Sequence, residues 1–285
     1  MSAYQRFSNR QISSTFAQFP AASAVPVGTV RTASNIGLSP GIQLVSNGTS
    51  WRPVSGTALL AQRSDNPVTV QSLTEVIAET LSFVGGFVLP GDRLDLDILQ
   101  NAGAISTSSR AVRAFIGATG SGFGGARIYD VFSTNNAAIS VARGLGYLLV
   151  RAGVDVGTVS NTTGVVTSSV TNGWNPNPDF TVPWEINFSG LSVAENAVTI
   201  TGATWAGGVA TFSAAGHTLA VGDKTVVSVV TPSGYNGTHI AATVPDANTF
   251  TVAMAVGPGL YTSGGQSART SNVIIQGYSL RWSAV

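Results

Sequence analysis

Apolar and polar residues alternate in short runs along most of this 285-residue chain, and turn-forming residues separate the runs. The clearest run contains Trp184, Ile186 and Phe188. Because successive side chains of a strand point to opposite faces, we expect these three residues to face a core and their polar neighbours to face solvent. Those neighbours are Glu185, Asn187 and Ser189. The dominant period predicts an all-β protein.

Several such runs predict an antiparallel head. In one of them Leu94, Leu96 and Ile98 alternate with charged residues, which places the apolar set on one face. The run 272–282 is too apolar to stand alone, so its partners must lie earlier in the chain. The predicted head strands are 75–84, 93–98, 110–116, 127–132, 137–151, 165–170, 181–188 and 272–282.

Two segments of the head leave helix and strand as alternatives. Ser72-Leu-Thr-Glu75 has the form of a helix capping box, yet the pattern that follows fits a first strand, and we predict a strand. The segment 137–151 is long enough for a helix, but Gly144 and Gly146 disfavour a helix interior. We predict two strands or one bent strand there.

The first 72 residues are organised differently. Residues 1–30 show no sustained period and carry scattered aromatic residues, Phe7, Phe16 and Phe19. Such a segment is either a frayed end or an extended arm whose aromatic residues anchor it to a particle or a sister chain. Residues 31–72 form a β-hairpin region with runs at 42–46, 50–54 and 57–61, and Asn47-Gly48 between the first two is a strong hairpin signal.

Residues 197–268, called the module below, contain five further runs separated by turns rich in Gly, Asn and Pro. Strands of this length and number can close into a small barrel. The exposed junctions on both sides are typical of an insertion into the head, which we place at 73–196 and 269–285. The predicted module strands are 197–200, 209–213, 225–230, 239–244 and 249–253.

The module resembles a known family. The order Thr204-Trp205, His217-Thr-Leu-Ala-Val-Gly-Asp223, Gly234-Tyr-Asn-Gly237 and Pro245-Asp-Ala-Asn-Thr-Phe-Thr-Val252 is similar to the small β-barrel called FCCH, after its place in ubiquitin-activating enzymes. The resemblance implies a barrel and recurrence in structural proteins of tailed bacteriophages. It implies no ubiquitin chemistry, because the chain has no cysteine.

The remainder resembles phage proteins as well. The block SNGTSWRPVSG is similar to a hairpin that precedes the heads of phage fibre and decoration proteins, and the pattern PGDRL, RAFIG, TVPWEINFSG and IIQGYSLRW is similar to the jelly-roll head of trimeric phage fibres. The resemblance implies an antiparallel jelly-roll sandwich interrupted by the module, and a homotrimer within a virion.

Composition limits the possible functions. Charged residues make up 9% of the chain, against about 25% in ordinary soluble domains. The surface is therefore either rich in Ser, Thr, Asn and Gly or covered by other chains, and we favour the second. A net charge of +1 provides no field to gather nucleic acid. No secretory signal and no run of 18 apolar residues is visible, so we expect synthesis in a cytoplasm and no membrane insertion.

Candidate catalytic and metal chemistry is sparse. Gly120-Ser-Gly-Phe-Gly-Gly125 has dinucleotide spacing, but a β-branched and aromatic run follows it in place of a helix. Asp92, Asp95 and Asp97 lack the spacing of a calcium loop. His217 and His239 have no recognisable serine or carboxylate partner. We therefore predict no catalytic residue, no metal ligand and no cofactor.

Two loops offer aromatic residues for sugar stacking: Trp174 with Asn175, and Tyr235. Packing within the fold or against a neighbouring chain is the interpretation that we favour for each. The sequence thus predicts a non-enzymatic structural subunit of a phage particle (fibre, spike or capsid decoration) whose partners are itself, other virion proteins and host surface polysaccharide. The alternatives are a glycan-cleaving tailspike, which needs two carboxylates about 5 to 10 Å apart, and a free carbohydrate-binding module.

Overall fold

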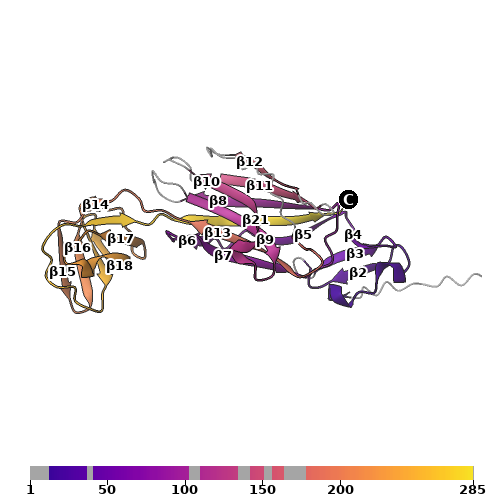
Figure 1. Cartoon of the computed structure of the whole chain (residues 1–285), viewed down its shortest axis with the longest axis horizontal. Coiled ribbons are helices and arrows are strands. Elements are labelled where there is room, and N and C mark those ends of the chain that lie inside the picture. The colour runs from indigo at the N-terminus through magenta and orange to yellow at the C-terminus, as the bar shows by residue number, and fades with distance from the viewer. Residues whose placement is uncertain are drawn as a thin grey trace, which may run out of the picture.

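The computed structural model describes residues 13–36, 41–102, 110–133, 142–150, 156–163 and 178–284. Its regular structure consists of strands, which form four sheets, and four short 3-10 turns. Figure 1 shows an elongated molecule with a small N-terminal sheet at one end, a sandwich in the middle and the module at the other end. None of the helical turns in the described ranges is long enough to cross a membrane.

The head is an antiparallel jelly roll, as the sequence predicts. One sheet has the order β12-β11-β8-β21-β5 and the other β10-β9-β13-β7, with β6 paired to β21. The module is inserted in the connection between β13 and β21, which lie in different sheets. The strands are β5 (Thr57–Arg63), β6 (Val68–Val70), β7 (Val76–Phe83), β8 (Arg93–Ala102), β9 (Arg110–Ala118), β10 (Ala126–Ser133), β11 (Ala142–Leu149), β12 (Val156–Thr163), β13 (Trp184–Leu191) and β21 (Val273–Ser283).

The core of the head follows the predicted alternation. Leu94, Leu96 and Ile98 of β8 are buried, and so are Trp184 of β13 and Trp282 of β21. Burial of large aromatic side chains from both sheets supplies the main hydrophobic stabilisation of such a sandwich.

The polar residues of β13 are also buried, which corrects the expectation that they face solvent. The Gly122 amide donates to Glu185 Oε1 (3.1 Å), and the Thr80 hydroxyl donates to Asn187 Oδ1 (2.6 Å). Ser189 donates to Glu75 on the same face. The 3-10 turn η3 (Gly122–Gly124) and the neighbouring strands cover this face, so protein groups replace water as hydrogen-bond partners.

The two contested segments are strands where the structure describes them. β7 confirms the strand predicted at 75–84, and β11 shows a register shift against β12 between Gly144 and Gly146. The run predicted at 165–170, residues 137–141 and residue 151 lie outside the described residues.

The N-terminal sheet packs on the head. Its strands are β1 (Ser13–Ser14), β2 (Val30–Ala33), β3 (Ile42–Ser46) and β4 (Trp51–Pro53). At the β3–β4 hairpin Gly48 has a φ of +93°, and Asn47 Oδ1 accepts from the Thr49 amide (2.9 Å). Leu44 and Trp51 belong to the same buried cluster as the head core. The head sheet also begins before the predicted boundary at 73, because β5 and β6 pair with β21.

The module has its own core and a curved seven-stranded sheet of order β14-β20-β17-β18-β19-β16-β15. The two edge strands are consecutive in the chain, and only Ile200 and Thr201 separate them, so the sheet curls toward a barrel. The sequence did not predict β15 and β20. The strands are β14 (Val198–Thr199), β15 (Gly202–Ala206), β16 (Val209–Ser213), β17 (Lys224–Ser228), β18 (Gly237–Asp246), β19 (Thr249–Ala253) and β20 (Gln266–Arg269).

Candidate functional site

The candidates for glycan contact fall in different places. Trp174 and Asn175 lie outside the described residues, as does Phe7 among the anchoring candidates. Tyr235 is 1% exposed, its ring lies edge-on to Phe212 and its hydroxyl donates to the Gly259 carbonyl (3.0 Å). Tyr235 is thus part of the module core and supports the adjacent loop.

Phe16 contacts the chain's own head, and Phe19 contacts the N-terminal sheet. The Phe16 ring lies 6.3 Å from that of Phe87, and the Phe19 ring lies 5.0 Å from that of Trp51. The Trp51 indole N–H donates to the Pro20 carbonyl (3.0 Å) and fixes the same segment. Both phenylalanines remain partly exposed.

A groove of about 710 Å³ lies on the module between β15 and the loop that precedes β20. β15 is the terminal strand of its sheet and pairs with β16 alone. Aromatic and hydroxyl side chains dominate the lining. They are Thr201, Thr204, Trp205, Thr211, Ser213, Tyr235 and Tyr261, and Leu260 adds an aliphatic side chain.

Trp205 is the exposed aromatic residue of this groove, with 38% of its surface accessible. Its indole N–H donates to the Met254 carbonyl (2.8 Å), and Gly257 approaches the ring so closely that a Cβ there would lie 3.1 Å from it. The Tyr261 hydroxyl donates to the Gly264 carbonyl (3.0 Å). Both aromatic rings are therefore held in fixed positions by backbone contacts.

The groove is electrically neutral, because none of its lining residues is ionisable except the tyrosines. Thr204 and Thr211 face each other across the β15–β16 ladder, and Ser213 lies two residues further on the same face of β16. Their hydroxyls can each donate and accept a hydrogen bond. Because Trp205 directly follows Thr204 in β15, its side chain points to the opposite face of the β15–β16 pair from these hydroxyls. The groove reaches both faces around the free edge of β15, so a ligand that stacks on Trp205 contacts the hydroxyls across that edge.

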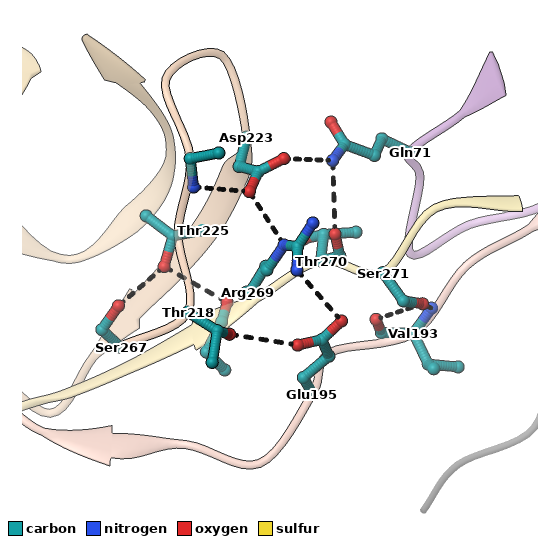
Figure 2. Close-up of polar contacts among 12 residues, drawn as sticks. Gln71, Val193, Glu195, Thr218, Asp223, Thr225, Ser267, Arg269, Thr270 and Ser271 are labelled. Carbon is teal, nitrogen blue, oxygen red and sulfur yellow. Dashed lines mark hydrogen bonds and ion pairs between the residues drawn. The ribbon is translucent and has the colours of Figure 1, made fainter. Parts of the chain in front are cut away.

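A cluster of charges lies where the module meets the segments that connect it to the head (Figure 2). Arg269 of β20 forms ion pairs with Asp223 (2.8 Å) and Glu195 (4.0 Å). Lys224 Nζ donates to the Gln71 carbonyl of the head (2.8 Å). Burial raises the pKa of Glu195, and the positive charge of Arg269 opposes that rise. This cluster has a structural role at the junction.

Carboxylates in the head also have structural roles. Asp92 is fully buried and accepts from Arg52 Nη1 (2.7 Å) and from the Trp282 indole N–H (2.9 Å). Burial alone raises the pKa of Glu185, but hydrogen bonds from Asn187 and Gly122 outweigh it and hold that pKa below its usual value. Within the described ranges, no three His, Cys, Asp or Glu side chains are grouped as metal ligands would be.

The two histidines lie in the module. His217 is buried with its ring edge-on to Phe250, 5.3 Å between centroids. His239 Nε2 lies 2.9 Å from the Tyr235 carbonyl. These contacts position the histidines as packing and bracing residues of the barrel.

Comparisons with known proteins give little further information. No family model and no curated protein matches the chain. A solved structure, the CBM2 module of the evolved Dit of Lactobacillus casei BL23 phage J-1, is similar with 10% identity over 72% of this chain and 70% of that chain, at a TM-score of 0.16. A similarity of this size assigns neither fold nor function.

The sequence missed the groove. Trp205 was visible only as part of the FCCH-like pattern, and no local signal links it to Tyr261, which lies more than fifty residues later. The groove arises when the loop before β20 folds back along the free edge of β15.

Proposed function

We propose that this chain is a non-enzymatic structural subunit of a tailed phage particle, of the fibre, spike or capsid decoration type. The observation that carries the proposal is the end-to-end arrangement of three β units (Figure 1). The N-terminal sheet, with Phe16 and Phe19, lies at one end of the head, and the module lies at the opposite end. Such a plan separates the end that attaches to a particle from the end that is presented outward.

Exposed apolar residues on the head support assembly into a homotrimer. Val76 and Ile77 are each 36% exposed on β7, an edge strand of its sheet. Leu99 of β8 and Leu145 of β11 are also exposed. Open edges and apolar flanks of this kind are covered in assemblies, because an unpaired edge otherwise invites uncontrolled strand pairing.

The ion pairs that acidic residues form with arginines favour a structural role over a glycan-cleaving one. Asp92, Glu79 and Glu75 form ion pairs with Arg52, Arg63 and Arg113. A carboxylate that acts as an acid or nucleophile must instead face a substrate cleft.

The test is co-purification. Particles from a lysate of a host strain that encodes the chain, banded on a density gradient and probed with an antibody, should contain it. Light scattering of the purified chain should give three times its 29.1 kDa mass. A chain that stays in the soluble fraction while particles form normally would contradict the proposal, and release of reducing ends from host polysaccharide would identify the enzyme alternative.

A further inference from the structure

We propose that the groove beside β15 binds a neutral oligosaccharide of pyranose sugars, with Trp205 as its stacking surface. The inference rests on the proposed function, since it assigns a ligand to the outward end of the attachment subunit. Tyr235 also lines this groove, but its ring is packed against Phe212 and only 1% of its surface is exposed, so Trp205 offers the accessible aromatic surface.

The state of the indole indicates the mode of binding. Its N–H is already bound to the Met254 carbonyl, and Gly257 lies against the ring. What Trp205 presents to the groove is therefore apolar ring surface in a fixed orientation. The C–H face of a pyranose ring is complementary to such a surface, and a fixed ring loses little conformational entropy on binding.

The lining indicates a neutral ligand. Acidic sugars, phosphates and nucleic acids are recognised by Arg, Lys or helix N-termini, and the groove has none of these. Thr204, Thr211 and Ser213 instead provide hydroxyls at regular strand spacing, on the face of the β15–β16 pair opposite to Trp205 and across the free edge of β15. Groups that both donate and accept suit sugar hydroxyls, which also do both.

The dimensions fit a short oligosaccharide. A volume of about 710 Å³ lies within the range of about 300–1,000 Å³ found for small-molecule sites. The site lies on the module, at the end of the molecule opposite the N-terminal sheet (Figure 1). A glycan chain on a cell surface could therefore enter the groove while the other end of the subunit is attached.

The deciding experiment follows Trp205 directly by ¹⁹F NMR. The full chain is labelled with 5-fluorotryptophan and titrated with cellotetraose, maltotetraose, chitotetraose and a galacto-oligosaccharide. The Trp205 resonance, assigned as the one absent from Trp205→Phe, should shift saturably with at least one of these probes while the buried Trp184 and Trp282 resonances stay fixed. A Trp205 resonance that moves with none of them overturns the inference, and so does a shift caused only by an extended peptide added to the free edge of β15.

Variants supply a second test. Trp205→Ala should lower the affinity for the bound oligosaccharide at least about tenfold, since exposed aromatic anchors carry a large share of binding energy. Trp205→Phe should retain part of the affinity, because it keeps an aromatic face. Phe123→Ala is the matched control, since Phe123 is 46% exposed on the head and outside the groove, and it should bind as the unaltered chain does.

The outcomes separate this inference from the proposed function. Loss of binding in Phe123→Ala as well as Trp205→Ala would contradict a site at the groove, provided that circular dichroism shows both variants folded. If Trp205→Ala incorporates into particles normally but no longer binds sugar, both proposals stand. If no oligosaccharide shifts the Trp205 resonance but the chain incorporates into particles, only the proposed sugar site is overturned. If the chain binds an oligosaccharide but is absent from particles, only the proposed virion role is overturned.

Discussion

Asp92 is a buried charge whose partners all come from the protein. It accepts from Arg52 Nη1, from the Trp282 indole and from the Leu89 amide (2.8 Å). These bonds join the N-terminal sheet, the turn before β8 and β21 at one point. In the sequence, Asp92 and its neighbours Asp95 and Asp97 lack the spacing of a calcium loop. The structure shows that the Asp92 carboxylate accepts hydrogen bonds from an arginine and an indole.

Replacing Asp92 with asparagine should therefore destabilise the head. We expect Asp92→Asn to lower the free energy of unfolding by about 3–5 kcal/mol, because it leaves buried donors with a weaker partner and Arg52 without its counter-charge. Urea unfolding measures the change. Asp95→Asn is the matched control, since Asp95 pairs with the exposed Arg93, and it should cost no more than about 1 kcal/mol. Equal losses would contradict the importance of burial at Asp92.

Tyr278 is a residue whose ionisation is tied to folding. Its hydroxyl donates to Glu79 Oε1 (2.8 Å), and burial together with this bond raises its pKa from 10.0 to about 12. The folded protein thus holds the proton more tightly than the unfolded chain. The stabilisation is complete below a pH of about 10 and is lost as the pH rises toward about 12.

We expect the free energy of unfolding to fall by up to about 3 kcal/mol across this window through Tyr278 alone. The measurement is urea unfolding at pH values near both ends of the window, alongside the absorbance of tyrosinate. Tyr278→Phe is the control, because it keeps the ring stacked on Phe188 (4.7 Å) but has no proton to lose. A variant with the same alkaline decline as the unaltered chain would show that other groups cause it.

At the scale of elements, Arg269 of β20 joins the module to the connecting segment through Glu195. Replacing Arg269 with methionine keeps much of the stem but removes the guanidinium that pairs with Asp223 and Glu195, and only the charge of Arg110 still acts on Glu195. Since removal of one partner from a buried ion pair costs about 3–5 kcal/mol, we expect the junction to open before the head unfolds. Limited proteolysis should then cut between residues 193 and 197 faster than in the unaltered chain.

Arg281→Met provides the comparison for this prediction, because Arg281 lies exposed on β21. It should leave the proteolysis rate unchanged. Equal cutting of the Arg269→Met variant and the unaltered chain would show that the hydrogen bonds of Gln71 and Lys224 hold the junction without the ion pairs.

The sequence predicted those elements whose apolar period is strong. The bounds of β3, β16 and β19 agree with the predicted runs, because each has buried apolar residues at alternate positions between clear turns. β20 (Gln266–Arg269) was missed because small and polar residues fill it, and β15 (Gly202–Ala206) because Trp205 stands alone among small and polar residues; pairing with neighbours defines both as strands. Burial of the polar face of β13 was equally invisible, since the covering η3 turn lies far away in sequence.

The candidate site was less predictable than the fold for a related reason. Local sequence identified aromatic residues in turns, such as Tyr235, but not which of them the fold would bury. Trp205 is accessible because the loop before β20 passes beside the edge of its strand, which depends on contacts across the whole module. Short-range patterns in the sequence therefore predict strands well but predict binding surfaces poorly.

At the scale of the whole molecule, the module and the head have separate buried clusters. The two connecting segments run side by side, with the Ser271 amide donating to the Val193 carbonyl (2.8 Å) and Ala194 bridged to Thr270. Ser192 and Ser271 are buried at the head, and the Ser192 hydroxyl donates to the Val70 carbonyl (2.8 Å). A deletion that removes the module should therefore start after Ser192 and end before Ser271, so that both serines remain in the head.

Replacing residues 194–270 with Asn-Gly should leave a folded head. Val193 and Ser271 are already paired as the flanks of a two-residue hairpin, for which Asn-Gly is the preferred turn. Loop-closure entropy changes only slowly with loop length, so the shorter connection should be neutral or slightly stabilising. We expect a single cooperative thermal transition within a few degrees of the head transition in the full chain. The isolated fragment 194–270 should also fold, because its core is internal. An insoluble head together with an unfolded fragment would show that the two clusters depend on each other for stability.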